Sequence, residues 1–135
     1  IVNHLVNRLA DFYEPFVDNI AIMKLGNHET EFIKRHHVDP MALLVNRLNE
    51  KRSDHLLPIF YGGYTMWWLV KFIGETNGAR NRSSSVKFWL HHGAGGAAPV
   101  TRGAIDRARI YDAITSDVYV IGHKHQSLHI LPFLL

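Results

Sequence analysis

The sequence contains no cysteine among its 135 residues. This absence excludes a disulfide scaffold and a zinc site built from thiolates, and it leaves the redox compartment open. The longest apolar stretches are far shorter than the roughly 20 residues of a membrane-spanning helix. The first twenty residues are not a signal peptide, because Arg8, Asp11, Glu14 and Asp18 interrupt them. We therefore predict a soluble, cytoplasmic protein that does not bind a membrane.

Charge is sparse, and neither sign dominates. Charged residues make up 20% of the chain and hydrophobic residues 47%, with a formal net charge of +3 at pH 7. This balance is typical of a folded protein, and the length fits one domain spanning residues 1–135. The small positive excess favours an anionic ligand, although scattered solvated Lys and Arg residues explain it more simply.

Three segments place apolar residues at the spacing of an amphipathic helix. They are residues 2–17, 41–48 and 102–114. Asp39 and Pro40 precede the second segment as a predicted N-cap and first helical residue.

Short apolar runs at 20–25, 86–90 and 118–121 are typical of strands. The run 56–73 is rich in aromatic and β-branched residues and is broken by Gly62 and Gly63, which predicts a hairpin. We expect Trp67 or Trp68 to lie in the core of this hairpin, which leaves the other open to base stacking. Alternating helices and strands predict an α/β fold.

Histidine, in one case together with asparagine, follows each of the three short strands. Histidine is abundant, with ten in the chain, and it is the commonest metal ligand. The strands lead into Asn27 and His28, His91 and His92, and His123 and His125. Ligands in α/β folds collect at the carboxyl ends of strands. We therefore expect the three strands in one sheet, covered by the helices at 2–17 and 102–114, with the polar ends converging.

The donor types at these strand ends suit a transition metal. An asparagine oxygen with imidazole nitrogens favours Mn, Fe, Zn, Ni or Co over Ca or Mg. His123 and His125 lie on one side of an extended segment, because strand side chains alternate. Each cluster also has a plainer explanation, as a turn or as a strand end with one buried and one exposed histidine. Three such clusters after three strands favour the metal site.

The order of these motifs resembles that of the calcineurin-like metallophosphoesterases. That family has Asp-x-His, Gly-Asp, Gly-Asn-His-Asp/Glu, a single His and Gly-His-x-His in turn. This chain has Gly26-Asn27-His28-Glu29, then His91, then Gly122-His123-Lys124-His125. The resemblance covers residues 20–125 and implies a mixed β-sheet sandwich flanked by helices. The implied activity is hydrolysis of phosphate esters by a water activated by two divalent ions, with Mn favoured among Mn, Fe, Zn and Ni.

The resemblance also implies a role for each matching residue. Asn27, His91 and His123 would bind one metal, and His125 would bind the other, with His92 as the alternative to His91. His28 would act on the substrate, either protonating the leaving oxygen or stabilising the phosphoryl charge. Glu29 would orient His28 or a metal ligand.

The sequence departs from the family in lacking two of its motifs. Neither Asp-x-His nor Gly-Asp occurs anywhere in the 135 residues. We expect both upstream of Ile1, so that the chain is a partial domain truncated at the N-terminus and shortened at the C-terminus. As it stands, we expect it to hydrolyse phosphate esters poorly or not at all. Two other functions stay open: a metal-binding or interaction remnant without catalysis, and a nuclease subunit that binds nucleic acid. The substrate and the oligomeric state are not determined by the sequence.

Overall fold

The computed structural model describes residues 1–74, 82–93 and 104–123. It combines helices with two small sheets, in agreement with the predicted α/β class. The chain divides into two compact units, residues 1–66 and residues 67–135. The single domain over residues 1–135 stays a prediction.

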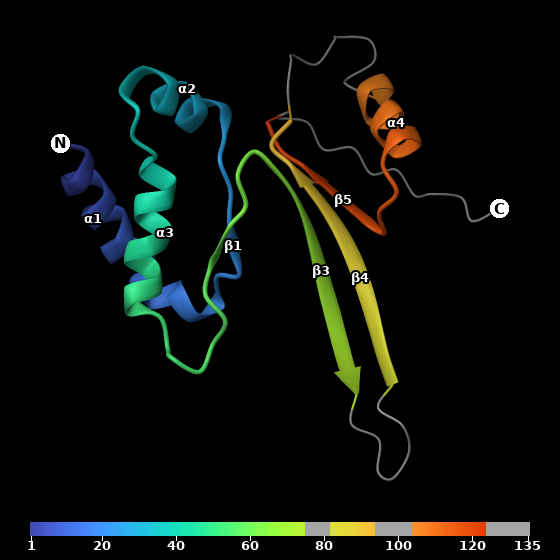
Figure 1. Ribbon diagram of the computed structural model, residues 1–135, viewed down its shortest axis with the longest axis horizontal. Helices are drawn as coiled ribbons and strands as arrows, with labels where there is room; N and C mark the ends of the chain where they lie inside the picture. The colour runs from blue at the N-terminus through green and yellow to red at the C-terminus, as the bar shows by residue number, and fades with distance from the viewer. Residues whose placement is uncertain (75–81, 94–103, 124–135) are drawn as a thin grey trace. The chain divides into compact units, whose positions relative to one another are not determined.

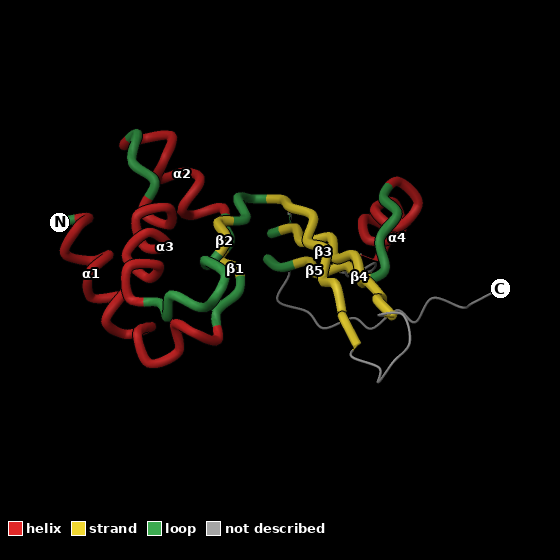
Figure 2. Tube along the Cα trace, turned by 60° about the horizontal axis from the view of Figure 1, so that its bottom comes forward, coloured by secondary structure: helices red, strands yellow, loops and turns green. Residues whose placement is uncertain are grey.

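The first unit is mainly helical (Figure 2). The predicted helix at 2–17 is confirmed as an α-helix that continues into a 3₁₀ helix, and the strand at 20–25 is shorter than predicted. Asn27 to His36, which the sequence indicated only as a loop after that strand, form a helix. The elements are α1 (Val2–Tyr13), η1 (Glu14–Asn19), β1 (Ile22–Met23), α2 (Asn27–His36), α3 (Pro40–Lys51) and β2 (Phe60–Tyr61).

Helix α3 begins where the sequence predicts. The Asp39 carboxylate accepts hydrogen bonds from the backbone N–H groups of Met41 and Ala42, at 3.0 and 2.9 Å. These donors have no partner within the helix, so the cap satisfies them. The Tyr61 hydroxyl donates to the other oxygen of the same carboxylate. One residue therefore both starts α3 and ties it to β2.

The core of the first unit lies between α1 and α3. Val6 and Ala10 on α1 face Leu44, Val45 and Leu48 on α3, and Leu48 is fully buried. The spacing of these residues places each set on one stripe of its helix. Burial of these apolar side chains is what holds the two helices together.

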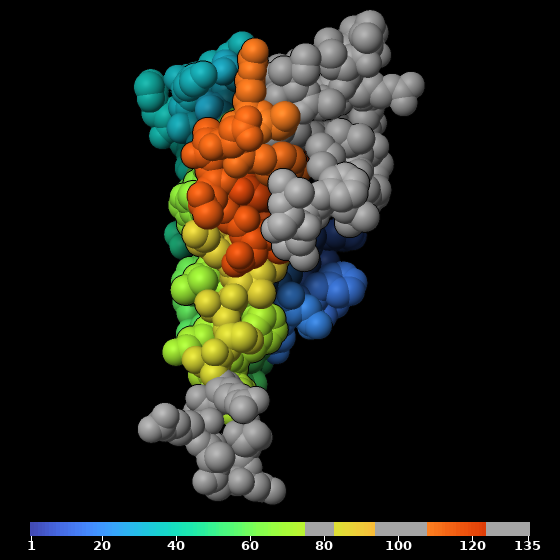
Figure 3. Space-filling model, turned by 90° about the vertical axis from the view of Figure 1, so that its right-hand side faces the viewer, coloured from blue at the N-terminus to red at the C-terminus, as the bar shows by residue number. Residues whose placement is uncertain are grey.

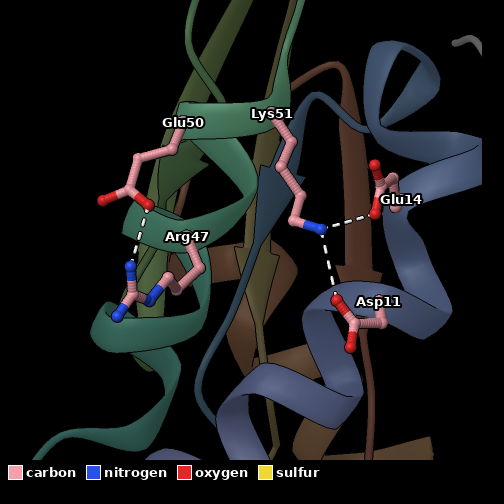
Figure 4. A network of polar contacts seen from close by, with 5 residues as sticks. All are labelled: Asp11, Glu14, Arg47, Glu50 and Lys51. Carbon is pink, nitrogen blue, oxygen red and sulfur yellow. Dashed lines mark hydrogen bonds and ion pairs between the residues drawn. The ribbon is translucent and has the colours of Figure 1, made fainter.

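Charged side chains connect α3 to α1 and η1 at the surface. The Lys51 ammonium on α3 donates to Asp11 at 3.2 Å and to Glu14, while Arg47 pairs with Glu50 on its own helix (Figure 4). The hydrogen bonds to Glu14 and Asp11 raise the pKa of Lys51. Exposed ion pairs contribute little to stability, so this network supplements the apolar core.

The predicted hairpin over residues 56–73 is wrong. β2 pairs in parallel with β1, Ile22 opposite Phe60 and Met23 opposite Tyr61, so the two halves of the predicted hairpin lie in different sheets. At Gly62 and Gly63 the chain leaves one sheet and enters the other. Gly63 has a φ of 55°, a backbone conformation that glycine adopts readily and that lets the chain turn there. A Cβ on Gly62 would lie 2.3 Å from the Met66 sulfur and 3.0 Å from Lys24 Cγ, so the side chains of Met66 and Lys24 occupy the space that a side chain at this position would need.

The second unit contains a sheet in the order β3–β4–β5. Figure 1 shows β3 and β4 as long strands that run in opposite directions, and β5 pairs in parallel with β4. The strands predicted at 86–90 and 118–121 and the helix predicted at 102–114 are confirmed. The elements are β3 (Thr65–Gly74), β4 (Arg82–His91), α4 (Ala104–Ala113) and β5 (Val118–Ile121).

Helix α4 packs on this sheet through aromatic rings. Tyr111 of α4 lies edge-on to Tyr119 of β5, with ring centroids 4.5 Å apart, and Tyr119 also contacts Trp89 of β4. Figure 3 shows the atoms of α4 and β5 in orange and red-orange above the green and yellow atoms of β3 and β4. The prediction that the helix at 102–114 lies on the sheet of strand 118–121 is therefore confirmed.

The prediction of one sheet for all three ligand-bearing strands is wrong. β1 belongs to the two-stranded sheet with β2, whereas β4 and β5 belong to the three-stranded sheet. Helix α1 packs on α3, so it does not cover a shared sheet. The physical reason is that β1 forms its hydrogen bonds with the segment 60–63, including Phe60 N–H to Ala21 O at 2.9 Å and Gly62 N–H to Met23 O at 2.8 Å.

Candidate metal-binding site

The carboxyl ends of β4 and β5 lie next to each other. Parallel pairing places Leu90 opposite Val120 and His91 opposite Ile121. One step further, the backbone N–H of Gly122 donates to the carbonyl of His91 at 3.0 Å. The residues that follow the two strands therefore leave the sheet at the same edge, as the prediction for these two clusters requires.

His92 and His123 come together at this edge. Their ring centroids lie 5.2 Å apart, with 52° between the ring planes. An imidazole bound at about 2.1 Å has its ring centre about 3 Å from the ion, so two rings on one tetrahedral ion have centres about 5 Å apart. The spacing of the two rings is that expected for a shared ion, and it is also the spacing of an ordinary ring contact, for which centroids lie about 4.5–7 Å apart.

His91 takes a different position from its neighbour. Its ring stacks on Trp89 with centroids 5.0 Å apart and an interplanar angle of 17°. This contact follows from strand geometry, since residues two apart in β4 share a face. The sequence favoured His91 as the ligand and kept His92 as the alternative, and the structure places the alternative beside His123.

Two glycines allow the strand ends to approach. Gly93 has a φ of 97°, a conformation that other residues rarely adopt, and a Cβ on it would lie 2.5 Å from the carbonyl oxygen of Gly122. A Cβ on Gly122 would lie 3.0 Å from the carbonyl oxygen of His92. His123 also has a positive φ of 67°. A residue with a side chain at position 93 would therefore push apart the two histidine-bearing loops.

The Gly-Asn-His-Glu motif forms the start of α2 in the first unit. Gly26 is the N-cap and Asn27 the first helical residue, and the exposed His28 follows it. The Glu29 carboxylate accepts a hydrogen bond from the Gly26 backbone N–H at 2.9 Å, as in a capping box. Glu29 therefore has a clear structural role, and its predicted role in orienting His28 or a ligand stays a prediction.

Lys24 is a residue that the sequence did not single out. It follows β1 directly, its ammonium donates to the carbonyl of Tyr64 at 3.2 Å, and burial lowers its pKa. A partly buried ammonium two residues before Gly26 is a cation near the motif of the predicted site. No signal in the sequence distinguished it, because its burial depends on the segment 62–66, which is far along the chain.

The structure therefore brings together some of the predicted ligands. His92 and His123 meet in the second unit, Asn27 and His28 belong to the first unit, and His125 lies outside the described residues. Among residues 1–74, 82–93 and 104–123, no three His, Asp or Glu side chains are grouped so that they could hold a metal ion. The convergence of Asn27, His91, His123 and His125 on one point stays a prediction.

Comparison with known proteins identifies no relative. Searches against protein families, curated proteins and solved structures find no match for this chain. In the part of the chain that the structure describes, no helix combines the length and apolar character needed to cross a membrane.

Proposed function

We propose that this protein is a metal-dependent hydrolase of phosphate esters, acting on monoesters or diesters, of the calcineurin-like kind that its motifs resemble. The observation that carries the proposal is the pair His92 and His123, which follow two adjacent parallel strands with ring centroids 5.2 Å apart. The order of the Gly-Asn-His-Glu, histidine and Gly-His-x-His motifs adds support from the sequence.

The donor set determines the ions that the proposal involves. Imidazole nitrogens favour Mn, Fe, Zn or Ni, and Mn is the ion that the resemblance favours. In this proposal His123 and one of His91 and His92 would hold the first ion, and His125 would contribute to the second. Asn27 is a ligand only in the sequence-based prediction. Two such ions supply an activated water and neutralise phosphate charge. The spacing of His92 and His123 favours His92 over His91 as the ligand.

The protein groups have separate tasks in the reaction. His28 is exposed at the start of α2, and in this proposal it protonates the oxygen of the leaving alcohol or stabilises the phosphoryl charge. The Lys24 ammonium adds positive charge close to the same motif in the chain. Glu29 holds the turn that presents His28, through its bond to the Gly26 N–H.

One observation weighs against the full family fold. β1 and β5 lie in different sheets, so Asn27 does not follow a strand of the sheet that positions the histidines. The proposal therefore rests on the edge formed by β4 and β5.

A metal-binding module without catalysis is the second candidate. It is favoured by the absence of Asp-x-His and Gly-Asp from the 135 residues, since these motifs supply the bridging carboxylate in the family. Both candidates assume the predicted cytoplasmic location, and they differ in turnover.

The site is tested by titrating the metal-free protein with Co²⁺, whose visible absorption reports imidazole ligands, and with Mn²⁺ and Zn²⁺ by calorimetry. We expect His92→Ala and His123→Ala each to weaken binding by about 10-fold or more. His4→Ala, an exposed histidine of α1, is the matched control and should bind as the wild type does. Equal binding by all four proteins would overturn the metal site.

Turnover separates the two candidates. The substrates are p-nitrophenyl phosphate and bis-p-nitrophenyl phosphate, assayed with added Mn²⁺ and with a chelator. We expect slow hydrolysis that needs Mn²⁺, reduced by His28→Ala at unchanged metal content and reduced together with metal content by His123→Ala. Metal binding without any turnover would select the non-catalytic module.

A further inference from the structure

The ribbon formed by β3 and β4 carries an exposed patch. Trp67 of β3 is 51% exposed, and the Lys87 ammonium of β4 lies 5.4 Å from the centroid of its ring. This contact places the two side chains on the same face of the ribbon. Because strand side chains alternate, Leu69 and Lys71 of β3 and Ser83 and Ser85 of β4 share this face, which we call the Trp67 face.

The charge of the ribbon has one sign. Residues 65–74 and 82–93 include Lys71, Arg82 and Lys87 and no Asp or Glu. The neighbouring carboxylate of Asp117 accepts a hydrogen bond from the Lys87 backbone N–H at 2.7 Å, so it is already engaged by the main chain. A ligand with several negative charges therefore complements the ribbon.

The mixture of side chains on the Trp67 face identifies the kind of polyanion. An exposed indole offers a surface on which a base stacks, and a nearby ammonium contacts the phosphate. Exposed serine hydroxyls hydrogen-bond to phosphate or sugar oxygens. A membrane surface fits less well, because Lys71 lies between the exposed Leu69 and Ile73 on this face, while the exposed Phe72 points to the other.

We propose that the Trp67 face binds single-stranded nucleic acid, with a base stacked on Trp67 and a phosphate held by Lys87. Lys87 lies on the same strand and face as His91, four residues or about 13 Å before it. If nucleic acid is also the substrate that the protein hydrolyses, that part of the inference rests on the proposed function. Binding itself needs no metal and is measured separately.

The experiment is fluorescence anisotropy of a labelled 20-nucleotide oligothymidylate with the full chain, in the presence of EDTA. Trp67→Ala should weaken binding by about 5- to 100-fold, as the loss of one stacked base does. Lys87→Gln should lower the slope of log K against log salt by about 0.7, the value for one phosphate contact to a single strand. Lys34→Gln, an exposed lysine of α2 in the first unit, makes the same charge change and should alter neither value.

Equal affinity of Trp67→Ala and wild type for the oligonucleotide would overturn the proposal. Binding to vesicles of anionic phospholipid in preference to the oligonucleotide would overturn it in favour of a membrane surface. Because EDTA removes metal, failure here leaves the histidine site untouched, and loss of metal binding in His92→Ala leaves the oligonucleotide result untouched.

Discussion

The two units of the molecule are stabilised in different ways. Within the described residues, seven buried apolar side chains hold α1, η1, α3 and Ile59, just before β2, together, whereas two, Trp89 and Leu90, are buried in the second unit. The second unit depends more on strand pairing and on ring contacts between Trp89, Tyr119 and Tyr111. The candidate metal site belongs to this second, less buried unit, so small changes there affect its geometry most.

The largest effect is expected at Trp89. It is 6% exposed and contacts both His91 and Tyr119, so Trp89→Ala leaves a cavity beneath the sheet edge. We expect a loss of about 3–5 kcal/mol in the free energy of unfolding, measured by urea denaturation with circular dichroism. The matched control is Trp67→Ala, because Trp67 is largely exposed and its removal should cost much less. Similar losses for the two variants would show that Trp89 is not the core of the second unit.

Leu48 provides the corresponding test in the first unit. It is 0% exposed between α1 and α3, and Leu48→Ala should lower the free energy of unfolding by about 2–5 kcal/mol. Leu57, which is 74% exposed, is the control, and Leu57→Ala should stay within about 0.5 kcal/mol of wild type. If Leu57→Ala were as damaging as Leu48→Ala, the core assigned to α1 and α3 would be incorrect.

Gly93 and Gly63 are glycines for different reasons. Gly93 allows a close approach of two chain segments, whereas Gly63 is needed only for its backbone angle. At Gly63 nothing lies within 4 Å of an added Cβ, so Gly63→Ala should cost about 1–2 kcal/mol for the left-handed conformation alone. Gly93→Ala adds a contact of 2.5 Å with the Gly122 oxygen and should cost more, above about 2 kcal/mol. It should also weaken Co²⁺ binding, whereas Gly63→Ala should not. Unchanged Co²⁺ affinity in Gly93→Ala would separate the glycine from the site.

The smallest expected effect is a pH dependence in the first unit. Hydrogen bonds from the Ser53 hydroxyl, at 2.6 Å, and from the Ser53 backbone N–H, at 3.0 Å, lower the pKa of Asp18. A carboxyl with a lowered pKa stabilises the fold above its unfolded pKa of about 3.9 and loses this effect as the pH falls through its folded pKa. Asp18→Asn should therefore make the melting temperature less sensitive to pH between about pH 5 and pH 2. The effect is small because the carboxylate is exposed, and parallel melting curves for both proteins would contradict it.

Local patterns predicted much of the fold correctly. The helix at 2–17, the cap at Asp39 and the strand at 118–121 depend on residues close in sequence, so their signals survive without tertiary information. The helix α2 was missed because its N-cap is a glycine, which also ends strands and forms turns. The hairpin was predicted wrongly because a Gly–Gly pair between apolar runs is compatible with either a tight turn or a change of sheet.

The candidate site was likewise predicted from the sequence only in part. The residue types after the strands predicted that β4 and β5 end in histidines that meet, and the parallel pairing agrees with this. Which histidine lies beside His123 could not come from sequence, because His91 and His92 are neighbours at the end of the same strand. It depends on Trp89, which stacks with His91, and on the turn at Gly93, which directs the chain after His92.

The sequence by itself determined the helices at 2–17 and 102–114, the strands at 86–90 and 118–121, the start of α3 and which of these strands lead into histidine. Periodicity and capping act over a few residues, and donor chemistry belongs to single side chains, so both are readable from the chain alone. Only the tertiary structure decided that β1 pairs with β2 and not with the sheet of β5, that Lys24 is partly buried, and that His92 faces His123. Each of these depends on backbone hydrogen bonds or contacts between residues about 30 to 40 positions apart, and such pairings leave no periodic mark in the sequence.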